Sequence, residues 1–152
     1  MNDETRQAYV AAFGAEHHEL RHLVRALHEA LREERPWSHE AAKEAAEHLA
    51  ALHTHLEHHF AQEEEGGYLE EALNLAPRFG AEAAELLRQH PQMLEKSRQV
   101  RTTADRAANE PAAWPQLKHE LLELIKGLMA HEGAENKIVQ QAFNTGFEEL
   151  DD

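Results

Sequence analysis

The chain has 152 residues, the size of one domain, and its 29 acidic against 15 basic residues give a formal net charge of −14, which repels phosphate backbones and argues against a nucleic-acid partner. Cysteine is absent, which excludes disulfides, thiolate nucleophiles and sulfur-ligated metal sites. The N-terminus lacks a signal-peptide pattern and no apolar run approaches the roughly 20 residues that span a bilayer, so we expect a cytoplasmic protein without a membrane partner.

Apolar residues that recur every three or four positions predict the first two helices. The first pattern runs from Val10 to Leu31 and stops near Pro36. The second begins after Ser38, a favourable N-cap residue, and continues to Glu63, before the glycine pair at positions 66 and 67. Both segments are long enough to form a side of a helical bundle.

Two further helices follow a connection at residues 68–75, which could itself be a helical extension. The third pattern runs from Phe79 to Ala104 and the fourth from Leu117 to Ala142. Almost nothing alternates with period two, so we predict an all-α chain. Four amphipathic helices with short connections favour a single domain over residues 1–152, an antiparallel up-down-up-down four-helix bundle. The periodicity is lost over residues 144–152, where we expect a flexible tail.

Two copies of one motif interrupt the apolar faces of the second and fourth helices. His59 is followed four residues later by Glu63, and His131 is followed four residues later by Glu135. This spacing stacks an imidazole and a carboxylate on one helical face. Bundles that direct two such pairs inward hold a pair of metal ions between carboxylates. The doubled motif therefore predicts a metal centre.

The depth of each polar residue in the bundle indicates which side chains meet. His17 lies 20 residues before the first turn, centred near residue 37, and His59 lies 22 residues after it. His90 and His131 fall at matching depths around the turns near residues 75 and 110, because every helix rises about 1.5 Å per residue. One layer then contains a histidine from each helix, beside two carboxylates that can bridge two metals. The predicted ligands are His17, His59, Glu63, His90, His131 and Glu135.

Several alternatives remain open at this point. Any one of these histidines could be a core residue whose polar atoms bond a neighbouring carboxylate. This interpretation does not suit all six polar residues together, because apolar side chains would fill the same layer at a lower free-energy cost. His18 replaces His17 if the first helix is rotated, and Pro91 either kinks the helix beside His90 or is a tolerated defect. His55, Glu64, Tyr68 and Glu132 are candidates for an additional ligand or a supporting contact. Of the other histidines, His22, His39, His58 and His119 are expected in solvent, and His28, His48 and His53 are ambiguous.

The chain resembles the hemerythrin-like proteins known as HHE cation-binding domains. The resemblance rests on residues 17–24 (HHELRHLV), residues 59–64 (HFAQEE), His90 and residues 128–136 (LMAHEGAEN). It implies a four-helix bundle around a non-haem di-iron centre, with the four histidines as terminal ligands and the two glutamates as bridges. Oxygen-carrying members have a histidine where this chain has Leu94, and an Asp five residues after the last ligand histidine in place of Glu135. These departures argue against reversible oxygen carriage.

The sequence thus predicts a protein that holds two iron ions, with manganese or zinc as alternatives, and that binds or reacts with dioxygen, nitric oxide or peroxide. A metal-handling or sensing module without catalysis is an alternative, and a metal-free helical interaction protein is a third. No nucleophile triad, phosphate loop or dinucleotide motif supports a conventional hydrolase, kinase or dehydrogenase.

Overall fold

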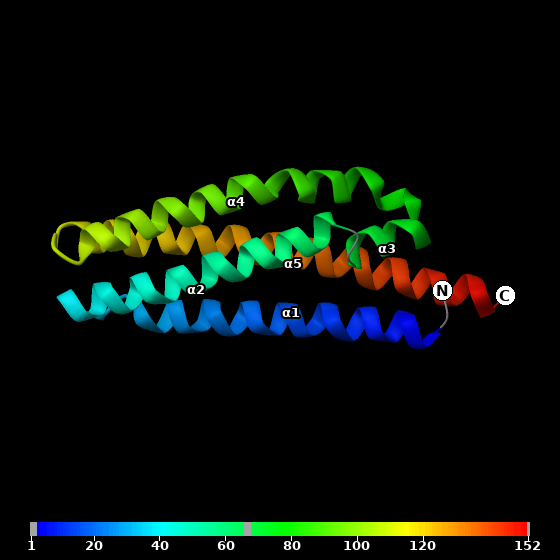
Figure 1. Cartoon of the computed structure of the whole chain (residues 1–152), viewed down its shortest axis with the longest axis horizontal. Coiled ribbons are helices and arrows are strands. Elements are labelled where there is room, and N and C mark those ends of the chain that lie inside the picture. Colours follow the sequence, from blue (N-terminus) through cyan, green and yellow to red (C-terminus); the bar gives the residue numbers. More distant parts are fainter. Residues whose placement is uncertain (1–2, 66–67, 152) are drawn as a thin grey trace.

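The computed structural model describes residues 3–65 and 68–151, and it confirms the antiparallel four-helix bundle (Figure 1). Within these residues the chain forms helices, turns and connections, and no strand. Side chains from residue 144 onward and several before His17 lie outside the description. The elements are α1 (Asp3–Ala30), α2 (His39–Glu64), α3 (Tyr68–Leu75), the 3-10 helix η1 (Pro77–Phe79), α4 (Gly80–Ala107) and α5 (Ala113–Asp151).

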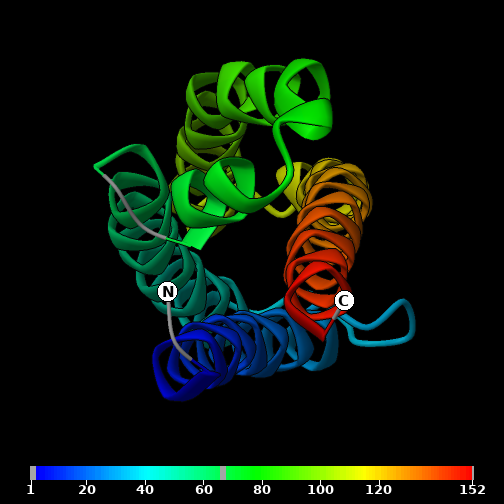
Figure 2. The same cartoon turned by 90° about the vertical axis from the view of Figure 1, so that its right-hand side faces the viewer.

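The four long helices surround a common interior (Figure 2). Helix α1 packs against α2 and α5, and α4 packs against the same two neighbours from the opposite side. Each long helix therefore presents one face to the centre, as the three-and-four spacing of apolar residues predicted. The predicted apolar residues that are described lie on these faces; Val10 and Phe13 fall outside the described side chains. Examples in the main core are Leu27, Leu49, Leu52, Val100, Leu117 and Leu124.

Hydrogen bonds at the end remote from the doubled motif set the lengthwise alignment of the helices. The Ser38 hydroxyl accepts a bond from the Ala41 amide at 2.9 Å and caps α2, as predicted. The Trp37 indole donates to the Ala107 carbonyl at 2.7 Å, and the Trp114 indole donates to the Arg35 carbonyl at 3.0 Å. These bonds link the connections of the bundle, so residues at equal distance from this end occupy the same layer.

Helix α3 is a separate short helix, so the connection at residues 68–75 does not extend α2. Leu69 packs with Leu86 of α4 and Ile138 of α5, and Ala72 packs with Val139. In Figure 2 this helix crosses the end of the bundle that lies nearest the viewer. It covers one end of the interior with apolar side chains.

Two segments differ from the periodicity of the sequence. Helix α4 continues through Pro91, which is exposed, so no new helix begins there. The proline removes one helical amide donor but directs its ring to solvent. The backbone of α5 is helical as far as Asp151, where the apolar pattern had ended near Ala142. The predicted flexibility of residues 144–152 stays a prediction.

Candidate metal centre

All six side chains predicted to bind metal are buried in the interior of the bundle. Their residual exposures range from 1% to 4%. They come from α1, α2, α4 and α5, so each long helix contributes at least one. His18 is exposed, which excludes the rotated alternative for α1. The layer predicted from chain positions is therefore formed by His17, His59, Glu63, His90, His131 and Glu135.

The six residues form two groups that share a carboxylate. His17, His59 and Glu135 offer ligand atoms that all lie within 4.8 Å of one another. A second group at the same spacing contains Glu63, His90, His131 and Glu135. We call these the α1/α2 half, with His17 and His59, and the α4/α5 half, with His90 and His131. A pair of ions in adjacent sites is the arrangement that such a donor set can accept.

Each carboxylate directs one oxygen to each half. Glu63 places Oε1 2.6 Å from Nε2 of His59 and Oε2 3.2 Å from Nε2 of His90. Glu135 contacts Nε2 of His131 through Oε1, while its Oε2 lies 3.7 Å from Nε2 of His17 and 3.6 Å from that of His59. Both glutamates therefore lie between the halves, in the position that bridging requires.

The imidazole pairs of the two halves have the same relative geometry. The ring centroids of His17 and His59 are 5.1 Å apart with an interplanar angle of 61°, and those of His90 and His131 have the same values. Phe60 stacks on His90 at 3.9 Å and 6°. The ring of Phe60 thus holds the α4/α5 half from the side, and the cluster has approximate twofold symmetry.

The donor set matches what a metal requires. Nε2 of His90 and His131 and both oxygens of Glu63 and Glu135 are buried, yet none makes a well-aligned hydrogen bond to the described residues. Burying two ionised carboxylates without a cation costs roughly several kcal/mol of folding free energy, because the carboxylates lose their solvation by water. Four imidazole nitrogens and four carboxylate oxygens suit iron, manganese or zinc, and nothing in the set is a soft sulfur ligand.

The pKa directions indicate which groups of the cluster hold protons when no metal is bound. Burial disfavours the charged imidazole of His59, but its contacts with Glu135 and Glu63 outweigh this and raise its pKa to about 10. The pKa of His90 is also raised, against burial, by Glu63 and Glu64. Burial opposes ionisation of Glu135, yet His131, His17 and His59 hold its pKa well below its usual value. Without metal, protons on imidazole therefore neutralise the carboxylates.

The outward-facing nitrogen of His17 is held by α5. Its Nδ1 lies 3.0 Å from Oδ1 of Asn136 and 3.4 Å from Oε1 of Glu132. Glu132 is itself buried and accepts from Nε of Arg21 at 2.8 Å. With Nδ1 occupied by these two acceptors, Nε2 is the atom that His17 can offer to a metal.

The other half has its own supporting partners. Nδ1 of His90 donates to Oε1 of Glu64 at 3.1 Å, and Nδ1 of His131 lies 2.8 Å from Oε1 of Gln89. Gln89 escaped the sequence analysis because it lies on a helix other than that of His131. Asn136 was part of the motif at residues 128–136, but its contact with His17 on α1 was not predicted. Their adjacency in sequence to His90 and Glu135 is the one signal that could have pointed to them.

The remaining candidates lie outside the two groups. His55 is half-buried and stacks on His59 with ring centroids 6.0 Å apart, so it supports that ring. The side chain of Tyr68 lies outside the described residues. Leu94 is partly buried and packs on the core. His22, His39, His58 and His119 are exposed as predicted; of the ambiguous ones, His53 is buried, His48 half-buried and His28 exposed.

Comparison with protein families gives a match over nearly the whole chain. A family model described as hemerythrin HHE cation binding domain matches residues 9–143, a span that contains all six clustered residues. Comparisons with curated proteins and with solved structures give no match. None of the helices within residues 3–65 and 68–151 has the length and apolar character that crossing a bilayer requires. With nearly the whole chain matched, the protein belongs to the hemerythrin HHE cation-binding domain family.

Proposed function

We propose that this protein is a non-haem di-iron protein that binds or reacts with a small diatomic molecule or peroxide. His17 and His59 would hold one ion, His90 and His131 the other, and Glu63 and Glu135 would bridge them. Iron in such a site supplies redox chemistry and binding of dioxygen, nitric oxide or peroxide.

One observation carries this proposal: both halves have the same donors. Each half has two imidazole Nε2 atoms and faces one oxygen from each of Glu63 and Glu135. Each ion would have four protein donor atoms, which is fewer than the roughly six donors that iron accepts in an octahedral site. A centre that saturated its metals with protein ligands would suit storage or structure, whereas this donor count favours binding of an external molecule.

The test is metal content together with spectroscopy. The protein is loaded with ferrous iron without oxygen, and iron per chain is measured before and after desalting. We expect about two irons per chain and a near-ultraviolet absorption band that changes on adding dioxygen, azide or nitric oxide. Absence of stoichiometric iron, or a spectrum indifferent to all three molecules, would contradict the proposal.

A matched pair of α2 variants controls for the general effect of losing a buried histidine. His59 is in the cluster, whereas His53 is also buried but bonds Oγ of Ser97 at 3.0 Å, outside both groups. His59→Ala is expected to lose iron from the α1/α2 half. His53→Ala is expected to keep two irons while losing some stability. Equal iron loss in both variants would mean that the effect comes from the fold.

A second candidate function is metal handling or sensing, in which the bound ion reports through the stability of the bundle. It is favoured by the contribution of all four long helices to one cluster, which couples ion binding to their packing. Metal should then raise the melting temperature and protect against proteolysis, without any reaction with oxygen or peroxide. A melting temperature indifferent to metal would exclude this function.

A further inference from the structure

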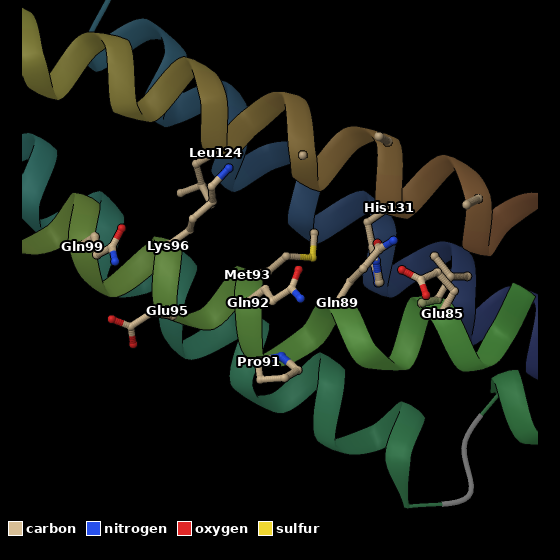
Figure 3. A pocket seen from close by; sticks show the side chains of 14 residues that line it. Glu85, Gln89, Pro91, Gln92, Met93, Glu95, Lys96, Gln99, Leu124 and His131 are labelled. Atoms are coloured by element: carbon tan, nitrogen blue, oxygen red, sulfur yellow. The ribbon is translucent and has the colours of Figure 1, made fainter.

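A groove on the surface lies between α4 and α5, beside the α4/α5 half. Its volume is about 820 Å³. Gln89 and Met93 of α4 line it on one side, and His131 of α5 lines it on the other (Figure 3). His131 is one of the clustered histidines, so the groove leads from solvent to the wall of the centre.

Small residues on α5 leave this groove open. Gly127, Ala130 and Ala134 all line it, and they flank His131 along the helix. A Cβ atom added at Gly127 would meet nothing within 4 Å. A larger side chain at Ala134 would cover His131, because helical side chains lean over the preceding turn, and larger ones at Gly127 and Ala130 would narrow the groove beside it. The access therefore depends on residue size on α5.

The innermost polar contact of the groove is the pair formed by Gln89 and His131. Gln89 is half-buried and its Oε1 lies 2.8 Å from Nδ1 of His131. Nearby Gln92 and Met93 are also neutral, while the charges of Glu85, Glu95 and Lys96 belong to exposed side chains. A neutral molecule can therefore approach His131 without separating an ion pair, and a net charge of −14 disfavours anions at low salt.

A second and smaller groove, of about 350 Å³, reaches the same half from the α2 side. Phe60 and Glu64 of α2 line it together with His90 and Leu94 of α4. The aromatic stack of Phe60 on His90 closes its inner side. Two surface depressions thus meet the α4/α5 half, and the larger one has the small-residue wall.

We propose that small neutral molecules enter the centre at the α4/α5 half, through the groove between α4 and α5, with Gln89 as the side chain that must move aside. This inference rests on the proposed function, because it assigns the entry route of the same site. It makes Gly127, Ala130 and Ala134 determinants of the rate of entry and leaves the metal ligands unchanged.

The first test compares an exposed groove alanine with an exposed alanine elsewhere. Ala134→Leu narrows the groove, whereas Ala51→Leu on α2 adds the same atoms to an exposed site that lines none of the described grooves. Association and dissociation of nitric oxide with the iron-loaded protein are followed by stopped-flow absorption. Ala134→Leu should slow both rates by about tenfold with little change in Kd, while Ala51→Leu should match the unmodified protein.

A second pair, with both changes on α5, gives the same comparison. Gly127→Leu adds a side chain inside the groove, and Gly133→Leu adds one where the surroundings are equally open but outside the groove. Both changes favour the helix. Slower binding in Gly127→Leu alone supports the route. Unchanged rates in both Ala134→Leu and Gly127→Leu, with normal binding and iron content, would overturn it.

A third measurement does not depend on iron or reaction. In the zinc-loaded protein, which is diamagnetic, dissolved dioxygen shortens the relaxation of protons that it contacts. We expect a stronger effect on the ring protons of His131 and the methyl group of Met93 than on the ring of His17, and a reduced effect in Ala134→Leu. Equal effects at His131 and His17 would overturn the route. If the unmodified protein binds no nitric oxide at all, the proposed function fails, a result distinct from binding with unaltered rates.

Discussion

The two halves of the centre have the same donors in the same arrangement, but different surroundings. In each, the ring centroids of two histidines are 5.1 Å apart at 61°, and one oxygen of Glu63 and one of Glu135 face the pair. The α1/α2 half is supported by a buried carboxylate, Glu132, which Arg21 holds in place. In the α4/α5 half, His90 donates to the exposed carboxylate of Glu64, a neutral amide supports His131, and a surface groove reaches His131.

This difference indicates how a symmetric cluster can give two unlike sites. A carboxylate that accepts from the outer nitrogen of a ligand histidine increases the basicity of the inner nitrogen, and an amide does so less. The supporting carboxylate is buried in the α1/α2 half (Glu132) and exposed in the α4/α5 half (Glu64), where water and salt screen its charge. We therefore expect tighter metal binding in the α1/α2 half and faster exchange of external molecules in the α4/α5 half. The donor atoms of the two halves would be the same, and the surrounding residues would make one half bind metal more tightly and the other exchange external molecules faster.

The largest effect is expected from Glu135, the carboxylate that belongs to both groups of potential ligands. Glu135→Ala removes the carboxylate present in both groups, so metal binding should be lost from both, with affinity reduced by more than about 100-fold. The metal-free variant should also lose about 3–5 kcal/mol of stability, because positively charged imidazole is left without its partner. Metal analysis after desalting and urea unfolding check the two effects. Retention of one tightly held ion would mean that Glu135 serves a single half.

A smaller effect should distinguish the halves. Glu132→Gln removes the negative charge beside His17, and we expect a 10- to 100-fold loss of affinity, roughly, for one of the two ions. Gln89→Ala, which removes the amide partner of His131, should cost less affinity and should accelerate binding of nitric oxide. Chelator competition measures the affinities of both variants. Equal losses in the two variants would remove the proposed electronic difference between the halves.

The smallest effect is expected from His53, which lies outside the metal centre. Its replacement should change how stability falls in acid without changing how much metal is bound. Burial lowers the pKa of His53 below its ordinary value of 6.5, and Glu57 opposes this only in part. The imidazole of His53 therefore binds a proton more readily in the unfolded chain than in the folded one. Its contribution to stability is present above the unfolded pKa and is lost as pH falls through the folded pKa. His53→Gln should flatten the fall in urea midpoint below about pH 6.5, with metal content unchanged. An unaltered slope would show that His53 does not titrate in this range.

Much of the site could be predicted from chain positions because helices have a constant rise. The apolar repeat orients His17, His59, His90 and His131 toward the interior, and counting residues from each turn places them at one depth. The same phase assigns His17 and not His18 to the interior. Spacing and the family resemblance both assigned bridging roles to Glu63 and Glu135, which stay proposals until metal is measured.

Other features depend on contacts between helices that no local pattern encodes. The pairing of His131 with Gln89, and of His17 with Asn136 and Glu132, requires knowing which faces of α4, α1 and α5 meet. The separate helix α3 reflects packing of Leu69 against Ile138 and Leu86, far along the chain. These contacts involve residue types that are common on any helix, and the packing of the neighbouring helices determines which side chains meet.

The sequence by itself determined the helical class, the number of long helices and the six polar residues of one layer, because these follow from hydrophobic period and helical rise. Only the tertiary structure decided that Glu63 and Glu135 direct one oxygen to each half, that the outer partners differ, and that a groove opens beside His131. The physical reason is that period and rise are properties of a single helix. Distances between side chains on different helices are set by how four helices pack together.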